Sequence, residues 1–368
     1  MNNKNFETYI DCGFSKIRAG AFNKSNSDEA FYIESNFFFD HSDIVAEIQK
    51  IITLLEKNTN EFIDDVNLMI DSPKMLSIGI SVSKKFDGSK LRQEDVQFLI
   101  QQAKQQIVKN YKDQNIIHII INNYRINDAE YTFLPNEING NLLSLDILFI
   151  CLPNEILNYF KNFFFKLNVS INQIACTSYV KSVNYKDKLS INEDVSFIDV
   201  GFNKTSITCY VKNKMVSLDV LPIGGNHITK DISKVLKVDI KQAESMKLNI
   251  NKNSDFLNVN FSLDLLQKIA IARTEEILEL CHNSIKLNLI TSDKLKMVLM
   301  GEGSRILDNQ NKEKISFSND IDFLEETIED ICQSGFRLGM GLNKQEVVIM
   351  PKKQIKQGFF EKLFHFFT

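Results

Sequence analysis

The 368-residue chain lacks several features that would assign it to a common functional class. No apolar run reaches the ~20 residues that a membrane-spanning helix needs, so any membrane contact should be peripheral. The polar segment Met1–Glu7 leads directly into a predicted strand, so we expect no secretion signal. The 43 Lys and Arg residues are outnumbered by 47 Asp and Glu residues and form no basic stripe, which argues against nucleic acid as a partner.

Patterns of reactive residues are also missing. The six cysteines are scattered without a Cys-x-x-Cys pair, which argues against a zinc site or a disulfide scaffold and fits reduced thiols in a reducing cytosol. The histidines show no metal-ligand spacing, and neither a nucleophile arrangement nor a Walker A loop can be recognised. The 43% hydrophobic content is that of a folded globular protein, and the length suits roughly two domains.

One supersecondary unit occurs twice. Residues 8–22 and 195–211 both show a strand that ends in Asp, a Gly-containing turn and a second strand. Such a repeat indicates an internally duplicated α/β protein with two lobes around a cleft. Between buried strands at 116–121 and 145–151, the chain is polar and turn-rich. Helical periodicity predicts helices at residues 42–56, 92–111, 154–167, 228–237, 240–247, 263–287 and 321–338.

Three turns carry residues suited to binding a nucleotide. The first, Asp11–Lys16, offers Gly13, whose missing Cβ lets backbone N–H groups approach phosphate oxygens. Lys16 supplies a positive charge, and the Asp at the strand end can hold Mg²⁺ through its water shell. The second turn, Asp199–Thr205, repeats this arrangement from the other half of the chain. The third, Met300–Ser304, has glycines that would let the backbone lie against a flat purine.

Taken singly, each turn is better explained as an ordinary turn, but the match between the first two favours a shared site. The order of the three resembles the first phosphate, second phosphate and adenosine motifs of the actin, sugar-kinase and heat-shock-chaperone ATPase superfamily. Within it, the sequence resembles the FtsA family of actin-like bacterial cell-division proteins over almost the whole chain. The segments that carry this resemblance are YIDCGFSKIRAGAF, FIDVGFNKTSITCY, LPIGGNHITKDIS, QAESMK and IARTEEILEL.

The resemblance implies an α/β, two-lobed actin-like ATPase fold. Duplicated ribonuclease-H-like domains would carry an FtsA-type inserted α+β subdomain and a C-terminal amphipathic helix. The expected parts are a first lobe (1–77 and 147–190), the inserted subdomain (78–146), a second lobe (191–226 and 296–343) with an outer subdomain (227–295), a linker (344–357) and a membrane-targeting helix (358–368).

The same resemblance implies ATP and Mg²⁺ between the lobes, with Asp11 and Asp199 holding the metal through water. For Glu244 and Lys247, an i,i+3 pair on the surface is the alternative to a ligand role, and the surrounding match favours the ligand role. The residues expected to line the nucleotide are Asp11, Gly13, Phe14, Ser15, Lys16, Asp199, Gly201, Phe202, Asn203, Thr205, Gly224, Gly225, Asn226, Glu244, Lys247, Gly301, Glu302, Gly303 and Ser304.

Four residues depart from the FtsA pattern. Phe14 stands where the family usually has a small residue, and Phe202 and Asn203 stand where it usually has glycines. Glu302 replaces a glycine in the adenosine turn. Added side chains narrow the approach of the backbone to a ligand, so we expect ATP binding with at most slow hydrolysis. The outer part of the second lobe, at about 251–262, is short, which bears on how FtsZ would dock.

The C-terminal residues are amphipathic. From residue 358, at ~100° per residue, apolar side chains fall in one arc and polar ones occupy the rest. Residues 344–368 carry five Lys and two Glu, a charge of +3 on a chain whose net charge is −4. This is typical of an interfacial membrane helix, and a terminal helix packed on the core is the alternative. The residues expected at the membrane are Phe359, Phe360, Leu363, Phe364, Phe366, Phe367, Lys352, Lys353 and Lys356.

The resemblance implies an ATP-binding, polymerising adaptor that anchors FtsZ to the cytoplasmic membrane at the division ring. Its expected partners are the C-terminal peptide of FtsZ, other copies of itself in actin-like filaments, anionic inner-membrane lipids and other divisome proteins. It would lie at the cytoplasmic face of the inner membrane. One alternative is a pilus-assembly-type scaffold that binds a peptide of an inner-membrane partner and needs no amphipathic tail. Another is a metabolic kinase of the superfamily, which the insertion and the small size disfavour.

Overall fold

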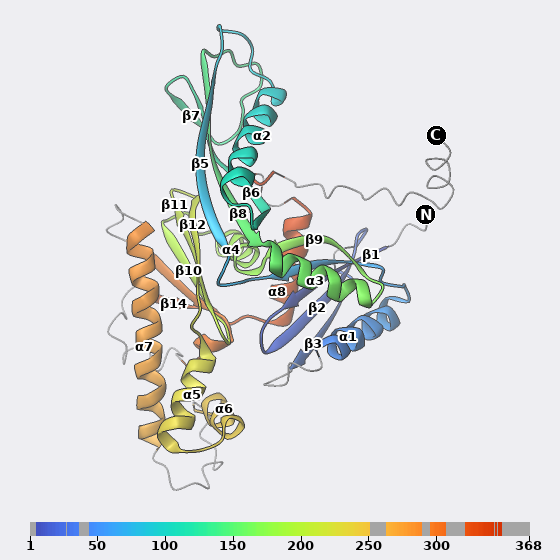
Figure 1. The fold of residues 1–368 in the computed structure, drawn as a ribbon, viewed down its shortest axis with the longest axis vertical. Coiled ribbons are helices and arrows are strands. Elements are labelled where there is room, and N and C mark those ends of the chain that lie inside the picture. The colour runs from blue at the N-terminus through green and yellow to red at the C-terminus, as the bar shows by residue number, and fades with distance from the viewer. Residues whose placement is uncertain are drawn as a thin grey trace.

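Three β-sheets and the helices that cover them make up the described part of the chain (Figure 1). The computed structural model describes residues 5–26, 28–36, 44–250, 263–288, 295–306, 321–341, 343 and 345–347. Within these residues, no helix has both the length and the apolar character that crossing a membrane requires. The predicted amphipathic tail lies outside the described residues.

The sheet that contains β1 and the sheet that contains β10 have the same topology. The first has the order β3-β2-β1-β4-β9, with β1 to β3 antiparallel and β4 and β9 parallel to β1. The other has the order β12-β11-β10-β13-β14, with the same alternation of directions. The predicted duplication is therefore confirmed. The strands are β1 Phe6–Cys12, β2 Lys16–Asn23, β3 Ala30–Asn36, β4 Asp65–Ile70, β9 Ser170–Cys176, β10 Val195–Val200, β11 Thr205–Val211, β12 Lys214–Leu221, β13 Lys296–Met300 and β14 Ile321–Phe323.

The central strands are mostly buried because helices or the other lobe cover both faces of each sheet. Alternate side chains of β10 therefore enter different cores. Phe197 packs in the core that also holds the first sheet, whereas Ile198 packs under the helices of the outer part of the second lobe. Those helices are α5 Gly225–Leu236, α6 Ile240–Leu248 and α7 Leu263–Asn288, seen at the lower left of Figure 1.

The inserted sheet lies between β4 and β9 in the chain and has its own core. Its order is β5-β8-β6-β7, and α2 Gln93–Asn110 covers it. The strands are β5 Leu76–Lys85, β6 Gln114–Ile126, β7 Ala129–Tyr131 and β8 Leu142–Pro153. Strands β6 and β8 extend into the region between residues 121 and 145, which the sequence predicts as turn-rich. They do so because polar side chains alternate with buried ones there. The residue bounds expected for each domain stay predictions.

Two helices, α4 Thr177–Lys188 and α8 Ile328–Gly339, join the lobes. Helix α4 packs against α8, which in turn covers β1 and β2. The remaining α-helices of the described residues are α1 Ile44–Thr59 and α3 Asn154–Lys166. The single helix expected at 321–338 is wrong in its first part. Residues 321–323 pair with β13 as β14, and α8 begins only after Thr327, whose hydroxyl accepts a hydrogen bond from the Asp330 N–H at 3.1 Å.

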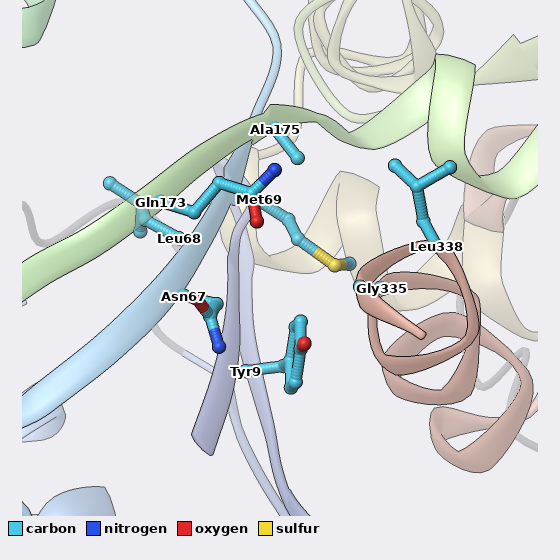
Figure 2. Close-up of a pocket in the computed structure, with 9 residues that line it drawn as sticks. Tyr9, Asn67, Leu68, Met69, Gln173, Ala175, Gly335 and Leu338 are labelled. Atoms are coloured by element: carbon cyan, nitrogen blue, oxygen red, sulfur yellow. The ribbon is translucent and has the colours of Figure 1, made fainter. Parts of the chain in front are cut away.

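Helix α8 approaches β1 closely through glycine. Gly335 faces the Tyr9 ring, and Figure 2 shows the Met69 side chain reaching toward it across a small pocket between α8 and the first sheet. A Cβ on Gly335 would overlap the Met69 sulfur and lie 2.8 Å from Cδ1 of Tyr9. The aromatic rings of Tyr9 and Phe336 meet edge to face, so neither helix nor strand can move away freely.

We predict that Gly335→Ala lowers the free energy of unfolding by about 1–2 kcal/mol. Overpacking a filled core costs ~1–3 kcal/mol, and the ~1 kcal/mol that Ala gains over Gly in a helix offsets only part of that cost. Urea denaturation measures the change. Gly79→Ala on β5 is the matched control, because nothing lies within 4 Å of the added Cβ. Equal stabilities of the two variants would contradict the close contact between α8 and β1.

Candidate nucleotide-binding site

The first two predicted turns have the same geometry. In the first, the Gly13 N–H donates to the Lys16 carbonyl at 3.0 Å, and in the second the Gly201 N–H donates to the Lys204 carbonyl at 2.9 Å. Each turn joins the central strand of its sheet to the antiparallel neighbour. The two sheets therefore place Asp11 at the end of β1 and its counterpart at the end of β10.

The N-terminus of α5 closes on the second turn. The Gly225 N–H donates to the Gly201 carbonyl at 2.9 Å, and the Asn226 N–H donates to the Phe202 carbonyl at 2.7 Å. A Cβ on Gly224 would lie 2.5 Å from the Gly201 carbonyl oxygen, so only glycine allows this approach. The predicted Gly-Gly-Asn segment thus lies directly on the second turn.

Side chains complete this contact. The Asn226 side-chain amide donates to the Asn203 side-chain oxygen at 2.8 Å, and the Thr205 hydroxyl donates to the Ile223 carbonyl at 2.7 Å. These hydrogen bonds join the second turn to the N-terminus of α5, while the buried Asn226 side-chain oxygen has no hydrogen-bond partner among the described residues. Any phosphate group would meet a preformed and rigid surface here.

The third turn also meets the second. Gly301 has φ +90°, and a Cβ on it would overlap a carboxylate oxygen of Asp199 and lie 2.6 Å from the Val200 carbonyl oxygen. The 3-10 helix η2 Glu302–Ile306 follows, and its Ser304 hydroxyl donates back to the Gly301 carbonyl at 2.7 Å. Glycine is needed at the turn because L side chains rarely adopt this backbone conformation.

Glu244 and Lys247 on α6 form a buried pair, which rules out the surface pair. The Lys247 ammonium contacts the Glu244 carboxylate at 2.7 Å and donates to the Gly225 carbonyl at 3.1 Å. It also lies 5.7 Å from the centre of the Phe202 ring. Burial lowers the pKa of Lys247, and Glu244 opposes that change. The pair ties α6 to the α5 N-terminus; its contact with ATP stays a prediction.

Asp11 is buried and already has two partners. Its carboxylate accepts a hydrogen bond from the Thr177 hydroxyl at 3.0 Å and pairs with the Arg18 guanidinium at 3.2 Å. Burial raises the pKa of Asp11, and the charges of Arg18 and Lys181 oppose that rise. Arg18 lies opposite Asp11 on the neighbouring strand, which explains why the two meet.

Asp199 has a cation of its own. The ammonium of Lys181, on α4, lies 2.6 Å from one Asp199 oxygen and 2.9 Å from an oxygen of Glu326. Burial alone would lower the pKa of Lys181, but the two carboxylates raise it above its ordinary value, so the side chain is a cation at neutral pH. Glu326 also accepts the Gly301 N–H at 2.9 Å, which links this cation to the third turn.

Two further ionic contacts cross between the lobes. Glu302, on the third turn, pairs with Lys16 at 3.1 Å and with Arg18 at 3.4 Å on the first turn and β2. Burial alone would raise the pKa of Glu302, but these cations and Arg305 bring it below its ordinary value. The residue expected to crowd the adenosine turn is thus a bridge to the other lobe.

A further contact joins the lobes, because Lys204 of the second turn donates to the Asp71 carbonyl at 2.6 Å. The Asp71 carboxylate accepts from the Ser206 hydroxyl at 3.0 Å. Burial alone would raise the pKa of Asp71, but the Lys204 ammonium and the hydrogen-bond donors bring it below its ordinary value. The exposed Phe14 ring lies 5.4 Å from the same ammonium.

The structure therefore gathers the predicted turn residues, together with Glu244 and Lys247, along the line where the lobes meet. Sequence reasoning missed the charged groups that pair with them. The only local signal for Lys181 is a charged residue within the otherwise uncharged segment at 177–183. That segment gives no indication of which residues pair with it. The missed residues are Arg18, Asp71, Thr177, Lys181, Lys204 and Glu326.

These groups can be tested against the ligands that the resemblance implies. Cations at the turns suit the phosphates of a nucleotide, and the first two turns each carry one. Lys16 pairs with Glu302, and Lys204 donates to the Asp71 carbonyl. The carboxylates do not suit Mg²⁺ in this arrangement, because Asp11 and Asp199 are each in contact with a cation. Among the described residues, no three His, Cys, Asp or Glu side chains gather as a set of metal ligands.

Comparison with solved structures identifies the class of protein. The PilM–PilN type IV pilus biogenesis complex matches with a TM-score of 0.61 at 12% identity, over 88% of this chain and 89% of that one. MreB5 of Spiroplasma citri bound to ADP matches with a TM-score of 0.50 at 11% identity, over 90% and 95%. The chain has the actin-like ATPase fold, whose members generally bind nucleotide with Mg²⁺.

Comparison of sequences narrows the class. A family model described as cell division protein FtsA matches residues 196–341. FtsA of Buchnera aphidicola subsp. Acyrthosiphon pisum (strain APS) is 25% identical over 362 residues, or 85% of each chain. FtsA of Agrobacterium fabrum is 20% identical over 273 residues, which span 69% of this chain and 61% of the relative. The chain is thus a relative of the FtsA cell-division proteins, as the motifs predict.

We predict slow ATP turnover from the side chains on the second turn. Phe202 and Asn203 stand where small residues would leave room, and Asn203 is fixed to α5. Single-turnover phosphate release should stay below about 1 s⁻¹, the low end of ordinary kcat values. The double change Phe202→Gly and Asn203→Gly should raise it. Asn213→Gly, in the β11–β12 turn, is the control and should change nothing; faster release by the unaltered protein would refute the crowding.

Proposed function

We propose that this protein is an ATP-binding, polymerising adaptor that anchors FtsZ to the cytoplasmic face of the inner membrane at the division site. The observation that carries the proposal is the sequence match to FtsA proteins, which extends to 85% of the Buchnera relative. The family-model match at 196–341 contains the second turn, α5 and the third turn. It therefore covers the half of the cleft that would contact the nucleotide from the second lobe.

The nucleotide would act mainly as a ligand that favours one arrangement of the lobes. Groups from both lobes meet at the turns, and ionic contacts such as Lys16–Glu302 join them. A ligand that binds one arrangement more tightly shifts the population toward it by its difference in affinity. When bound, ATP supplies phosphate charge between the two glycine turns. The chain's own part is to hold those phosphates with Lys16 and Lys204 and to present a filament-competent surface.

Membrane attachment would come from the predicted C-terminal helix. Full burial of one Phe side chain is worth ~1.5–3 kcal/mol, but interfacial insertion buries each only in part, and ordering the helix has an entropic cost. Basic residues add ~1 kcal/mol each near anionic lipid. One tail would then bind reversibly, whereas a filament that presents many tails gains avidity without any new contact.

A scaffold of the pilus-assembly type is the second candidate, because the PilM–PilN complex matches the fold. At 12% identity that likeness shows the fold alone. Such a scaffold would bind a short peptide of an inner-membrane protein and would have no use for an amphipathic tail. Its predictions therefore differ from those of the adaptor at the membrane.

Electron microscopy on lipid monolayers tests the proposal. We predict that the full chain forms filaments on monolayers containing anionic lipid in the presence of ATP, because each filament presents many tails. A fluorescent peptide with the sequence of the C-terminus of FtsZ should bind those filaments. Bare monolayers with ATP, at protein concentrations where the soluble protein is folded, would exclude the polymerising adaptor and leave the scaffold.

The tail is tested separately by liposome flotation. Deleting Gly358–Thr368, or changing Phe360 and Phe364 to Glu, should release the protein from anionic liposomes and leave ATP binding intact. The control is His365→Glu with Thr368→Glu, which changes the charge similarly on the polar side of the predicted helix. If the truncated chain still floats, the tail is not the anchor and the pilus-type scaffold gains support.

A further inference from the structure

Lys181 is a buried cation at the point where the lobes meet. Its side chain is 4% exposed, and its ammonium contacts two carboxylates that are themselves 13% and 6% exposed. It belongs to α4, which follows the first sheet, whereas Asp199 ends the central strand of the other sheet. A buried charge of this kind persists only where partners compensate its lost hydration.

Two carboxylates, from different elements, contact the Lys181 ammonium. Asp199 approaches from β10 at 2.6 Å, and Glu326 approaches from the segment before α8 at 2.9 Å. The Tyr185 hydroxyl and the Gly301 N–H both donate to Glu326 at 2.9 Å, which fixes that carboxylate. The charge of Lys181 also acts on Asp11, the strand-end carboxylate of the first lobe.

Arg18 completes the arrangement on the other side. Its guanidinium pairs with Asp11 at 3.2 Å and reaches Glu34 and Glu302 at 3.2 Å and 3.4 Å. Each strand-end carboxylate is therefore in contact with a cation of this chain, and each of these cations is shared with further carboxylates. Mg²⁺ takes oxygen ligands, directly or through its own waters, in a near-ideal octahedron. That octahedron would have to be built on carboxylates whose oxygens already contact an ammonium and a guanidinium.

We propose that Lys181, with Arg18, takes the place of the divalent metal, so that the cleft accepts the phosphates of a nucleotide without Mg²⁺. The proposal rests on the nucleotide part of the proposed function. It commits to ATP and ADP as free polyphosphate anions. Lys181 is a positioning residue in this arrangement: it holds Asp199, Glu326 and the Gly301 turn in register with the first lobe.

The first experiment titrates Mg²⁺ alone, so it does not depend on nucleotide. Isothermal calorimetry and thermal shift on the full chain should show no saturable binding of Mg²⁺ and no stabilisation. Lys181→Met should gain Mg²⁺ binding, because it leaves Asp199 and Glu326 without a counter-ion. Lys186→Met, which removes a lysine of the same helix that contacts Asn213 instead, should behave as the unaltered chain does. Saturable binding of Mg²⁺ by the unaltered chain would overturn the proposal.

The second experiment measures ATP affinity in EDTA and in Mg²⁺. The unaltered chain should differ by less than about threefold between the two conditions, and Lys181→Met should lose about tenfold or more in EDTA. Added Mg²⁺ should restore the affinity of Lys181→Met, since the metal can then enter. If Lys181→Met does not fold, Lys181→Met with Glu326→Gln removes one of the two unpaired charges and should show the same loss in EDTA.

The outcomes separate the two proposals. An unaltered chain that binds ATP only with Mg²⁺ overturns the inference and leaves the nucleotide function standing. A purely structural Lys181 would leave the affinity in EDTA unchanged on substitution, and this too overturns it. If the unaltered chain binds ATP under neither condition, the nucleotide part of the proposed function fails, and the titration with Mg²⁺ alone still decides whether Lys181 occupies the place of the metal.

Discussion

The joining of the two lobes depends on the pairing of buried carboxylates with cations. Asp11, Asp71 and Asp199 all lie at or just beyond the ends of buried strands, where an uncompensated charge would be costly. Asp11 and Asp199 each pair with a cation, and, against the effect of burial, the Lys204 charge lowers the pKa of Asp71. For Asp71 and Asp199 that cation belongs to the opposite lobe. Cations of the chain itself therefore offset the negative charge of the carboxylates at these strand ends. Separating the lobes would break the Lys181–Asp199 pair, whereas the Arg18–Asp11 pair lies within one sheet and would persist.

The duplication explains why the pairs come in corresponding places but use different residues. The two central strands end at matching positions, so both halves inherit a carboxylate beside a glycine turn. The residue opposite Asp11 on β2 is Arg18, whereas the residue opposite Asp199 on β11 is Ser206. A local cross-strand partner serves the first half, and the second half takes its cation from α4.

The same difference shows how far the sequence could predict the structure. The duplicated hairpins were predictable because apolar strands and glycine turns are local patterns, and so was the fold that they define. Residues 321–323 were misassigned because a three-residue strand next to a helix leaves no periodicity of its own. Lys181 could not be placed, because its partner Glu326 lies 145 residues away and only the packing of α4 on α8 brings them together. The bridge from Glu302 to the first lobe escaped prediction for the same reason.

The inserted subdomain also receives the end of the described chain. Gln345 and Val347 exchange two backbone hydrogen bonds with β6, and Glu346 contacts His118 at 2.6 Å and the Tyr179 hydroxyl at 3.1 Å. If the residues beyond Val347 are held elsewhere, a pull on them acts first on this short pairing. Peeling three residues from β6 would lengthen the tether by about 10 Å. The pairing would thus give the chain beyond Val347 an adjustable reach from the inserted subdomain.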